Sequence, residues 1–217
     1  MRPNFNLAIL FLLLCTAACQ PILPTDGAAS DQPSAHVLYR DDFSNPESGW
    51  RAAANPGGRA DYADGVFRIT LDQPNSDAWA SPGLDLSDVR LDVEAIKAGG
   101  DRNNRFGILC RVTSPARYYI FMISSDGYYG IGKVNQGQYE LLGSQSLLPS
   151  DKIPQGSEYL RLRADCVQDR LALYVNEQLI TEVMDAEFES GDVGLIAGSY
   201  QTAGVDILFD NFTVARP

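Results

Sequence analysis

The chain has 217 residues, which is long enough for one domain with a hydrophobic core after terminal segments are set aside. Hydrophobic residues make up 45% and charged residues 21%, a composition that excludes a disordered or fibrous chain. The formal net charge of -11 argues against nucleic acid as a partner. This acidity either keeps the protein soluble outside a cell or attracts divalent cations.

Residues 1–18 are predicted to be a lipoprotein signal peptide. Arg2 precedes an apolar run at residues 7–14 that ends in small residues and is too short to span a bilayer. Thr16-Ala17-Ala18-Cys19 resembles the lipobox of bacterial lipoproteins, although Thr16 stands where leucine is usual. The resemblance implies a lipid on Cys19 and a membrane-anchored, extracytoplasmic place in the cell envelope. In the alternative, an ordinary signal peptide is removed and Cys19 is incidental.

Residues 19–36 are predicted to be a flexible tether, because Pro, Ala, Ser, Asp and Gly offer little surface to bury. His36, the one histidine of the chain, ends this stretch. We expect it to be a surface residue rather than a metal ligand or a general base. Residues 37–217 are predicted to form one domain.

The first half of this domain shows short apolar runs separated by turn residues. Residues 36–43 predict a first strand, and the turn after it ends on Trp50. Asp64-Gly65 joins two runs and predicts a hairpin. Apolar and polar residues alternate over 89–94, which is typical of a strand with one solvated face.

Two strands with different patterns are expected next. In residues 105–112, Phe106, Ile108, Cys110 and Val112 share one side. Residues 117–124 are apolar on both sides, which predicts a central strand that is covered on both faces. A further strand at 128–134, a short edge strand at 138–142 and a long loop at 144–156 follow.

Residues 160–175 predict an antiparallel hairpin with one apolar face, which requires a second sheet to cover it. The last strands are expected at 178–183, 192–199 and 205–214. The fold class is therefore all-β, with two antiparallel sheets packed as a sandwich.

Cys110 and Cys166 are the cysteines left for the folded part once Cys15 and Cys19 are assigned to the signal peptide and the lipid. Both fall on the apolar side of their strands. In an exported protein, two inward cysteines suggest a disulfide inside the sandwich. Two buried free thiols are the alternative.

Three segments resemble the closing strands of concanavalin A-like and laminin G-like jelly-roll sandwiches: LALYVNEQLI, SGDVGLIAGS and VDILFDNFTV. The opening DDFSNPESGW is similar to the first strand and turn of the same group, which includes the 3-keto-disaccharide hydrolase-like domains. The resemblance covers about residues 37–214 and implies a jelly-roll fold. It does not select an activity, because this superfamily includes lectins, glycosidases and adhesion modules.

Aromatic side chains are the candidate ligand-binding groups, because sugars stack their apolar faces on such rings. Gly130 and Gly132 could leave a shallow groove beside them. Alternatively, the aromatic rings fill the core or pair across strands. The candidates are Trp50, Trp79, Tyr118, Tyr128 and Tyr129.

Acidic residues suggest two further sites. The resemblance places the first and last strands side by side, so Asp41, Asp42 and Asp210 could bind Ca²⁺, or they are solvated strand-end acids. A glycosidase needs two facing carboxylates, and the dense acidic run does not reproduce the order found in glycosidases of this superfamily. That run contains Glu182, Asp185, Glu187 and Glu189.

The sequence thus predicts a non-catalytic, lipid-anchored module that binds a glycan or a cell-envelope component. No cofactor is expected apart from Ca²⁺. A glycoside hydrolase is the first alternative and would show two carboxylates across a cleft. A structural or protein-interaction module is the second, and would show an exposed apolar patch without a groove.

Overall fold

The computed structural model describes residues 36–52, 56–156 and 159–217, and these residues form sixteen β-strands and no helix. The predicted signal peptide, the lipidation site at Cys19 and most of the predicted tether lie outside the described residues. Ala35–Pro217 is a compact unit with its own core. No described segment forms a helix long and apolar enough to cross a membrane.

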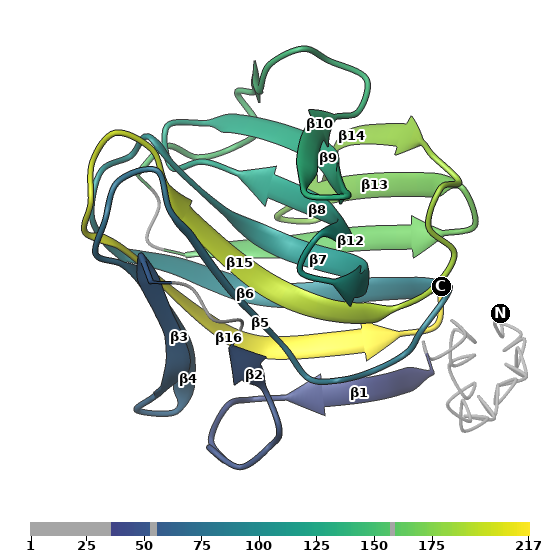
Figure 1. Cartoon of the computed structure of the whole chain (residues 1–217), viewed down its shortest axis with the longest axis horizontal. Helices are drawn as coiled ribbons and strands as arrows, with labels where there is room; N and C mark the ends of the chain where they lie inside the picture. The colour runs from purple at the N-terminus through teal and green to yellow at the C-terminus, as the bar shows by residue number, and fades with distance from the viewer. Residues whose placement is uncertain (1–35, 53–55, 157–158) are drawn as a thin grey trace, which may run out of the picture. The chain divides into compact units, whose positions relative to one another are not determined.

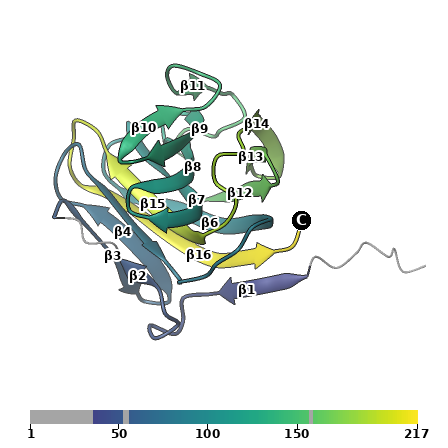
Figure 2. The ribbon, with the colours of Figure 1, turned by 45° about the vertical axis from the view of Figure 1, so that its right-hand side comes forward.

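Sheet A is one of two antiparallel layers, and its central strands are β6, β16 and β12 (Figure 1). β1 pairs with the C-terminal half of β16, so the two ends of the described unit lie side by side (Figure 2). In spatial order, the sheet contains β14 (Gln178–Met184), β13 (Arg170–Val175), β12 (Leu160–Val167), β6 (Val89–Gly99), β16 (Val205–Ala215), β4 (Val66–Leu71) and β3 (Gly58–Ala63), with β1 (Val37–Asp41) on β16.

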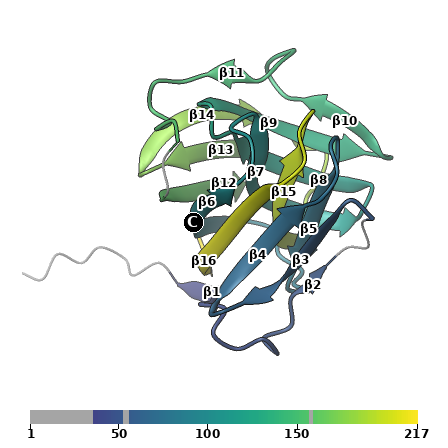
Figure 3. The ribbon, with the colours of Figure 1, turned by 90° about the vertical axis from the view of Figure 1, so that its left-hand side faces the viewer.

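Sheet B faces sheet A, as Figure 3 shows with β12, β13 and β14 on one side and β8 and β10 on the other. The strand predicted to be central, β8, lies between β7 and β9. In spatial order, the sheet contains β10 (Gln138–Leu141), β9 (Tyr128–Asn135), β8 (Arg117–Ile123), β7 (Asn104–Ser114), β15 (Asp192–Ser199), β5 (Asp77–Ser81) and β2 (Arg51–Ala52), with β11 (Leu148–Pro149) on β9.

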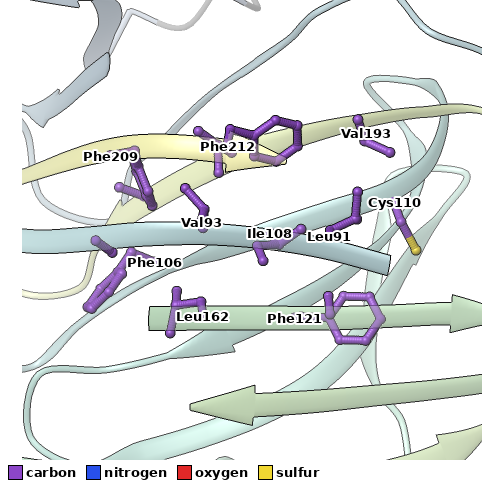
Figure 4. Close-up of a cluster of buried hydrophobic side chains, with 14 of the residues drawn as sticks. Leu91, Val93, Phe106, Ile108, Cys110, Phe121, Leu162, Val193, Phe209 and Phe212 are labelled. Carbon is purple, nitrogen blue, oxygen red and sulfur yellow. The ribbon is translucent and has the colours of Figure 1, made fainter. Parts of the chain in front are cut away.

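The main core lies between the two sheets, because alternate residues of each strand point toward the opposite sheet. Figure 4 shows side chains from both layers meeting there, among them Leu91 and Leu162 from sheet A and Phe121 from sheet B. The all-β prediction with two packed antiparallel sheets is therefore confirmed.

A disulfide joins Cys110 of β7 to Cys166 of β12, and thus ties sheet B to sheet A. Both cysteines are fully buried within the main core. The prediction of a disulfide inside the sandwich is confirmed, and the alternative of two free thiols is wrong.

The inward pattern predicted for residues 105–112 is wrong at Val112, which lies on the outer face of sheet B. The preceding residue, Arg111, has a left-handed backbone with φ 53°, and this bulge interrupts the alternation. The buried guanidinium of Arg111 donates to the carbonyl oxygens of Gln168 and Phe188, at 2.8 and 2.7 Å. These bonds hold two connecting loops together and account for the unusual backbone at this position.

Candidate functional site

The outer face of sheet B carries a second apolar cluster, separate from the main core. Across the sheet, Trp79 of β5 is paired with Ile196 of β15, Ile196 with Gly107 of β7, and Gly107 with Met122 of β8. Residues paired in this way point to the same face. The buried members of the cluster are Leu109, Val112, Tyr118, Ile120, Met122, Val134 and Ile196, with Trp79, Leu141 and Leu147 packed against them.

A cavity of about 450 Å³ is formed on this cluster, and we call it the sheet B groove. Its volume lies within the range of small-molecule sites. Three tyrosines and one ion pair supply its polar groups. The lining residues are Asp77, Arg105, Pro115, Tyr118, Ile120, Met122, Val134, Gly137, Tyr139, Ile196 and Tyr200.

The ion pair at one end of the groove joins β5 to β7 across the intervening strand β15. Asp77 and Arg105 are both paired with Gly198 of β15. A Cβ atom on Gly198 would lie 2.6 Å from Nε of Arg105 and closer still to Oδ1 of Asp77. The ion pair therefore requires a residue without a side chain between its partners.

Arg105 is held from two sides. Its Nε donates to Oδ1 of Asp77 at 2.7 Å, and its Nη2 lies 2.5 Å from the same oxygen. Its guanidinium carbon lies 4.7 Å from the centre of the Tyr200 ring, a cation-π contact. Burial opposes the charge of Arg105, but Asp77 and Tyr200 outweigh it and raise the pKa of the guanidinium.

Because both contacts use Oδ1, Oδ2 of Asp77 accepts no hydrogen bond from the described residues, and the carboxylate is 39% exposed. A carboxylate oxygen in this position can accept a hydrogen bond from a ligand hydroxyl. The positive charge of Arg105 is already balanced by Asp77. The polar end of the groove therefore suits a neutral hydroxylated group better than an anion.

Tyr139 of β10 forms one wall of the groove. Its ring lies over Gly132 of β9, where a Cβ atom would be 3.1 Å from Cε2 of the ring. Its hydroxyl donates to Sδ of Met122 at 3.6 Å. The expected open groove over the two glycines of β9 is therefore wrong, since Tyr139 covers Gly132 and leucine side chains cover Gly130.

The phenol groups of Tyr118 and Tyr139 are hydrogen-bond donors at neutral pH. Burial, together with the negative charge of Asp77, raises the pKa of Tyr118 to about 12. Burial also raises the pKa of Tyr139, to which Tyr200 and Asp77 add. Both hydroxyls therefore lie within electrostatic reach of the Asp77–Arg105 pair.

The predicted aromatic residues fall in different places. Tyr118 lines the sheet B groove, and Trp79 borders it with ring centroids 6.1 Å apart. Tyr128 lines a neighbouring depression that shares Tyr200 with the groove. Tyr129 is directed to the other side of β9 and packs against the main core.

Trp50 does not present its ring to a ligand, because only 7% of it is exposed and it belongs to the main core. Its Nε1 donates to Oδ2 of Asp41 at 2.9 Å. The prediction of a binding role for Trp50 is therefore wrong. Its position at the end of a turn is explained instead by packing against Phe43, Phe67 and Phe212.

The predicted calcium ligands do not form one cluster, although Asp42 lies near Asp210, whose pKa is raised first by burial and further by the charge of Asp42. Asp41 is buried and accepts hydrogen bonds from the backbone N–H of Phe43 and from the side chains of Tyr39, Ser48 and Trp50. Asp42, the next residue, is exposed and binds Ser44 instead. The described residues contain no group of three or more His, Cys, Asp or Glu side chains that could hold a metal ion. Asp41, Asp42 and Asp210 therefore do not form the expected site.

The acidic run near residue 185 fixes a loop to sheet B. Nζ of Lys133 lies 2.8 Å from Asp185 and 2.6 Å from Glu187. Tyr119 donates to Asp185 as well. Burial opposes ionisation of Asp185, but Lys133 and Tyr119 outweigh it and lower the pKa of this carboxyl. A carboxylate held ionised in this way is unsuited to the role of a general acid.

Sequence reasoning missed four groups that line the groove: Asp77, Arg105, Tyr139 and Tyr200. Asp77 lies two residues before Trp79 on one short strand, so both side chains point to the same face, and this spacing could have identified Asp77 from the sequence. The pairing of Asp77 with Arg105 leaves no local signal, because it depends on the register of three separate strands.

No protein-family model and no curated protein sequence matches this chain. Among solved structures, the carbohydrate-binding module CBM66 from Bacillus subtilis has a TM-score of 0.61 at 15% identity, covering 77% of this chain and 95% of that one. The β-glucanase of Bacillus licheniformis has a TM-score of 0.61 at 12% identity, covering 85% and 100%. The carbohydrate recognition domain of Emp47p has a TM-score of 0.55 at 14% identity, covering 85% and 98%. These likenesses show that the chain has the expected jelly-roll fold, which the similar structures of binding modules and of a glucanase also have.

Proposed function

We propose that this chain is a non-catalytic module that binds a glycan or a glycan-bearing component of the cell envelope in the sheet B groove. The observation that carries the proposal is the composition of that groove. Rings of Tyr118, Tyr139 and Tyr200 offer apolar faces, while the Asp77–Arg105 pair offers hydrogen-bonding groups at one end. Sugars need both kinds of surface, because their ring faces are apolar and their edges carry hydroxyls.

The fold supports the proposal, since carbohydrate-binding and carbohydrate-recognition domains are among the similar structures. We also propose that a lipid on Cys19 anchors the module outside the cytoplasm. The lipobox resemblance motivates this anchor. The Cys110–Cys166 disulfide is consistent with an oxidising compartment.

Hydrolysis is the rival function, because a β-glucanase shares the fold. A glycosidase requires a pair of carboxyl groups flanking the scissile bond, one acting as acid. Among the described residues that line the sheet B groove, Asp77 is the one carboxylate, and Arg105 holds it. This favours binding over hydrolysis in the groove.

The test uses soluble protein from residue 20 to residue 217, shown first to unfold cooperatively. It would be titrated against a panel of polysaccharides, with calcium and with a chelator, while released reducing ends are measured. Tyr139→Ala should weaken binding roughly tenfold or more. Tyr159→Ala is the matched control, since Tyr139 is 51% exposed and Tyr159 is 50% exposed but does not line the groove.

Equal loss of binding in both variants, or binding that is unaffected in both, would refute the groove as the glycan site. Release of reducing ends by the wild-type protein would establish the hydrolase instead. A folded protein that binds no glycan in the panel would leave the structural or protein-interaction module as the better account.

A further inference from the structure

The sheet B groove has two chemically different ends. Arg105 is one residue before Phe106, which is paired with Ile123, so the ion pair lies level with Ser124, the residue that follows β8. Tyr118 is at the other end of the same strand, six residues away, which is about 20 Å along an antiparallel strand. The groove therefore follows β8 over most of its length.

The charged groups are confined to one end. Among the described residues that line the groove, Asp77 and Arg105 are the charged ones, and they are adjacent to each other. Besides burial, the charge of Asp77 raises the pKa of Tyr118 and Tyr139, so the hydroxyls of both lie close to this pair. The remaining length is lined by apolar side chains, namely Met122, Ile120, Ile196, Val134 and Pro115.

Neither a wholly polar nor a wholly apolar ligand fits both ends. A sugar hydroxyl placed against Ile120 and Val134 would lose its water without gaining a partner, which costs free energy. An apolar ligand over Asp77 would remove water from a carboxylate without replacing its hydrogen bonds. A ligand that carries a hydroxylated head and a hydrocarbon chain meets neither penalty.

We propose that the groove binds an amphipathic glycan, in which a neutral sugar head lies at the Asp77–Arg105 pair and an alkyl or acyl chain lies along β8 toward Pro115. This inference rests on the proposed function, since it assigns the class of glycan to the same groove. The ion pair favours a neutral head, because the charge of Arg105 is already balanced by Asp77.

The probes are hexyl, octyl and decyl glucosides and galactosides, each kept below the concentration at which it forms micelles. Glucose and galactose are the probes without a chain, and 1-octanol is the probe without a sugar. Trp79 borders the groove and reports binding by its fluorescence, while Trp50, the other tryptophan of the chain, lies in the main core. Each added methylene should tighten binding about threefold to fourfold until the chain fills the groove.

A variant that places a charge at the apolar end of the groove tests whether the hydrocarbon chain of the ligand lies there. Pro115 is exposed at the rim, so Pro115→Asp should leave the fold intact. It should reduce or abolish the gain in affinity from octyl to decyl chains. Thr113→Asp is the control, because Thr113 is also exposed, two residues away, and does not line the groove.

The outcomes separate the two proposals. Glycosides that bind no more tightly than the free sugars would overturn the amphipathic ligand and leave glycan binding intact. If 1-octanol binds as tightly as octyl glucoside, the head is not recognised and both proposals fail. If Pro115→Asp and Thr113→Asp have the same effect on the chain-length series, the chain does not lie along β8 and the inference is overturned.

Discussion

Removal of the disulfide tests how this sandwich is stabilised. In the double variant Cys110→Ala and Cys166→Ala, the unfolded chain loses a cross-link between residues 56 positions apart. The chain-entropy relation assigns about 4 kcal/mol to closing a loop of that length. Domains of this size have free energies of unfolding of about 5–15 kcal/mol, so the variant should remain folded but lose a large part of its stability.

The assay is urea unfolding followed by tryptophan fluorescence. With a slope of about 2 kcal/mol per molar urea, the midpoint should fall by about 2 M. The slope itself should rise, because an unfolded chain without the cross-link exposes more surface. The native wild-type protein should resist reduction by dithiothreitol, since both cysteines are fully buried.

A loss below about 1 kcal/mol with an unchanged slope would refute this reasoning. It would mean that the unfolded chain is already compact around these residues, or that other contacts between the sheets restrict it equally. The buried Arg111, whose side chain joins two loops near the disulfide, would then be the first such contact to remove.

Three further predictions concern the groove and sheet A. Gly198→Ala should weaken glycan binding roughly tenfold in calorimetry, because the new methyl group separates Asp77 from Arg105. Binding should stay constant from about pH 7 to pH 10, since burial keeps Tyr118 and Tyr139 protonated; a fall near pH 9 would contradict this. Burial opposes ionisation of Asp165, but Arg163 and Arg90 outweigh it and lower its pKa. Asp165→Asn should therefore cost about 1–2 kcal/mol near neutral pH. In the wild-type protein, Asp165 becomes protonated as the pH falls through its lowered pKa, and its stabilising contribution is lost. The melting temperature of Asp165→Asn should therefore fall less than that of the wild-type protein between roughly pH 5 and pH 2.

Much of the fold was predictable from alternation alone. The period of two, together with turn signals, identified most strands of both sheets, but it missed the two-residue strands β2 and β11, the second of which lies in the predicted loop 144–156. The parity of Cys110 and Cys166 was sufficient to place both sulfurs in the core. The pattern failed at Val112, because a left-handed Arg111 reverses the side on which the following residue points. Such a bulge depends on loops distant in sequence, which bind the Arg111 side chain.

The candidate site was less predictable than the fold. Tyr118 and Trp79 were proposed on their chemistry, and they lie at or beside the groove. Trp50 has the same chemistry but fills the core, because the buried Asp41 accepts the hydrogen bond of its indole. Aromatic character therefore cannot distinguish a ligand platform from a core residue without the strand register.

The pattern of β8 nevertheless contained information about the site. A sandwich of two sheets has one interior, so a strand in it is expected to be apolar on one face and solvated on the other. β8 is buried on both faces, with Tyr118, Ile120 and Met122 directed away from the main core. No third layer covers these residues in the described part of the chain; neighbouring side chains cover them in part and leave the groove. A strand that is apolar on both sides in a two-layer fold thus indicates an apolar outer surface, and here that surface runs along β8 from the Asp77–Arg105 pair toward Pro115.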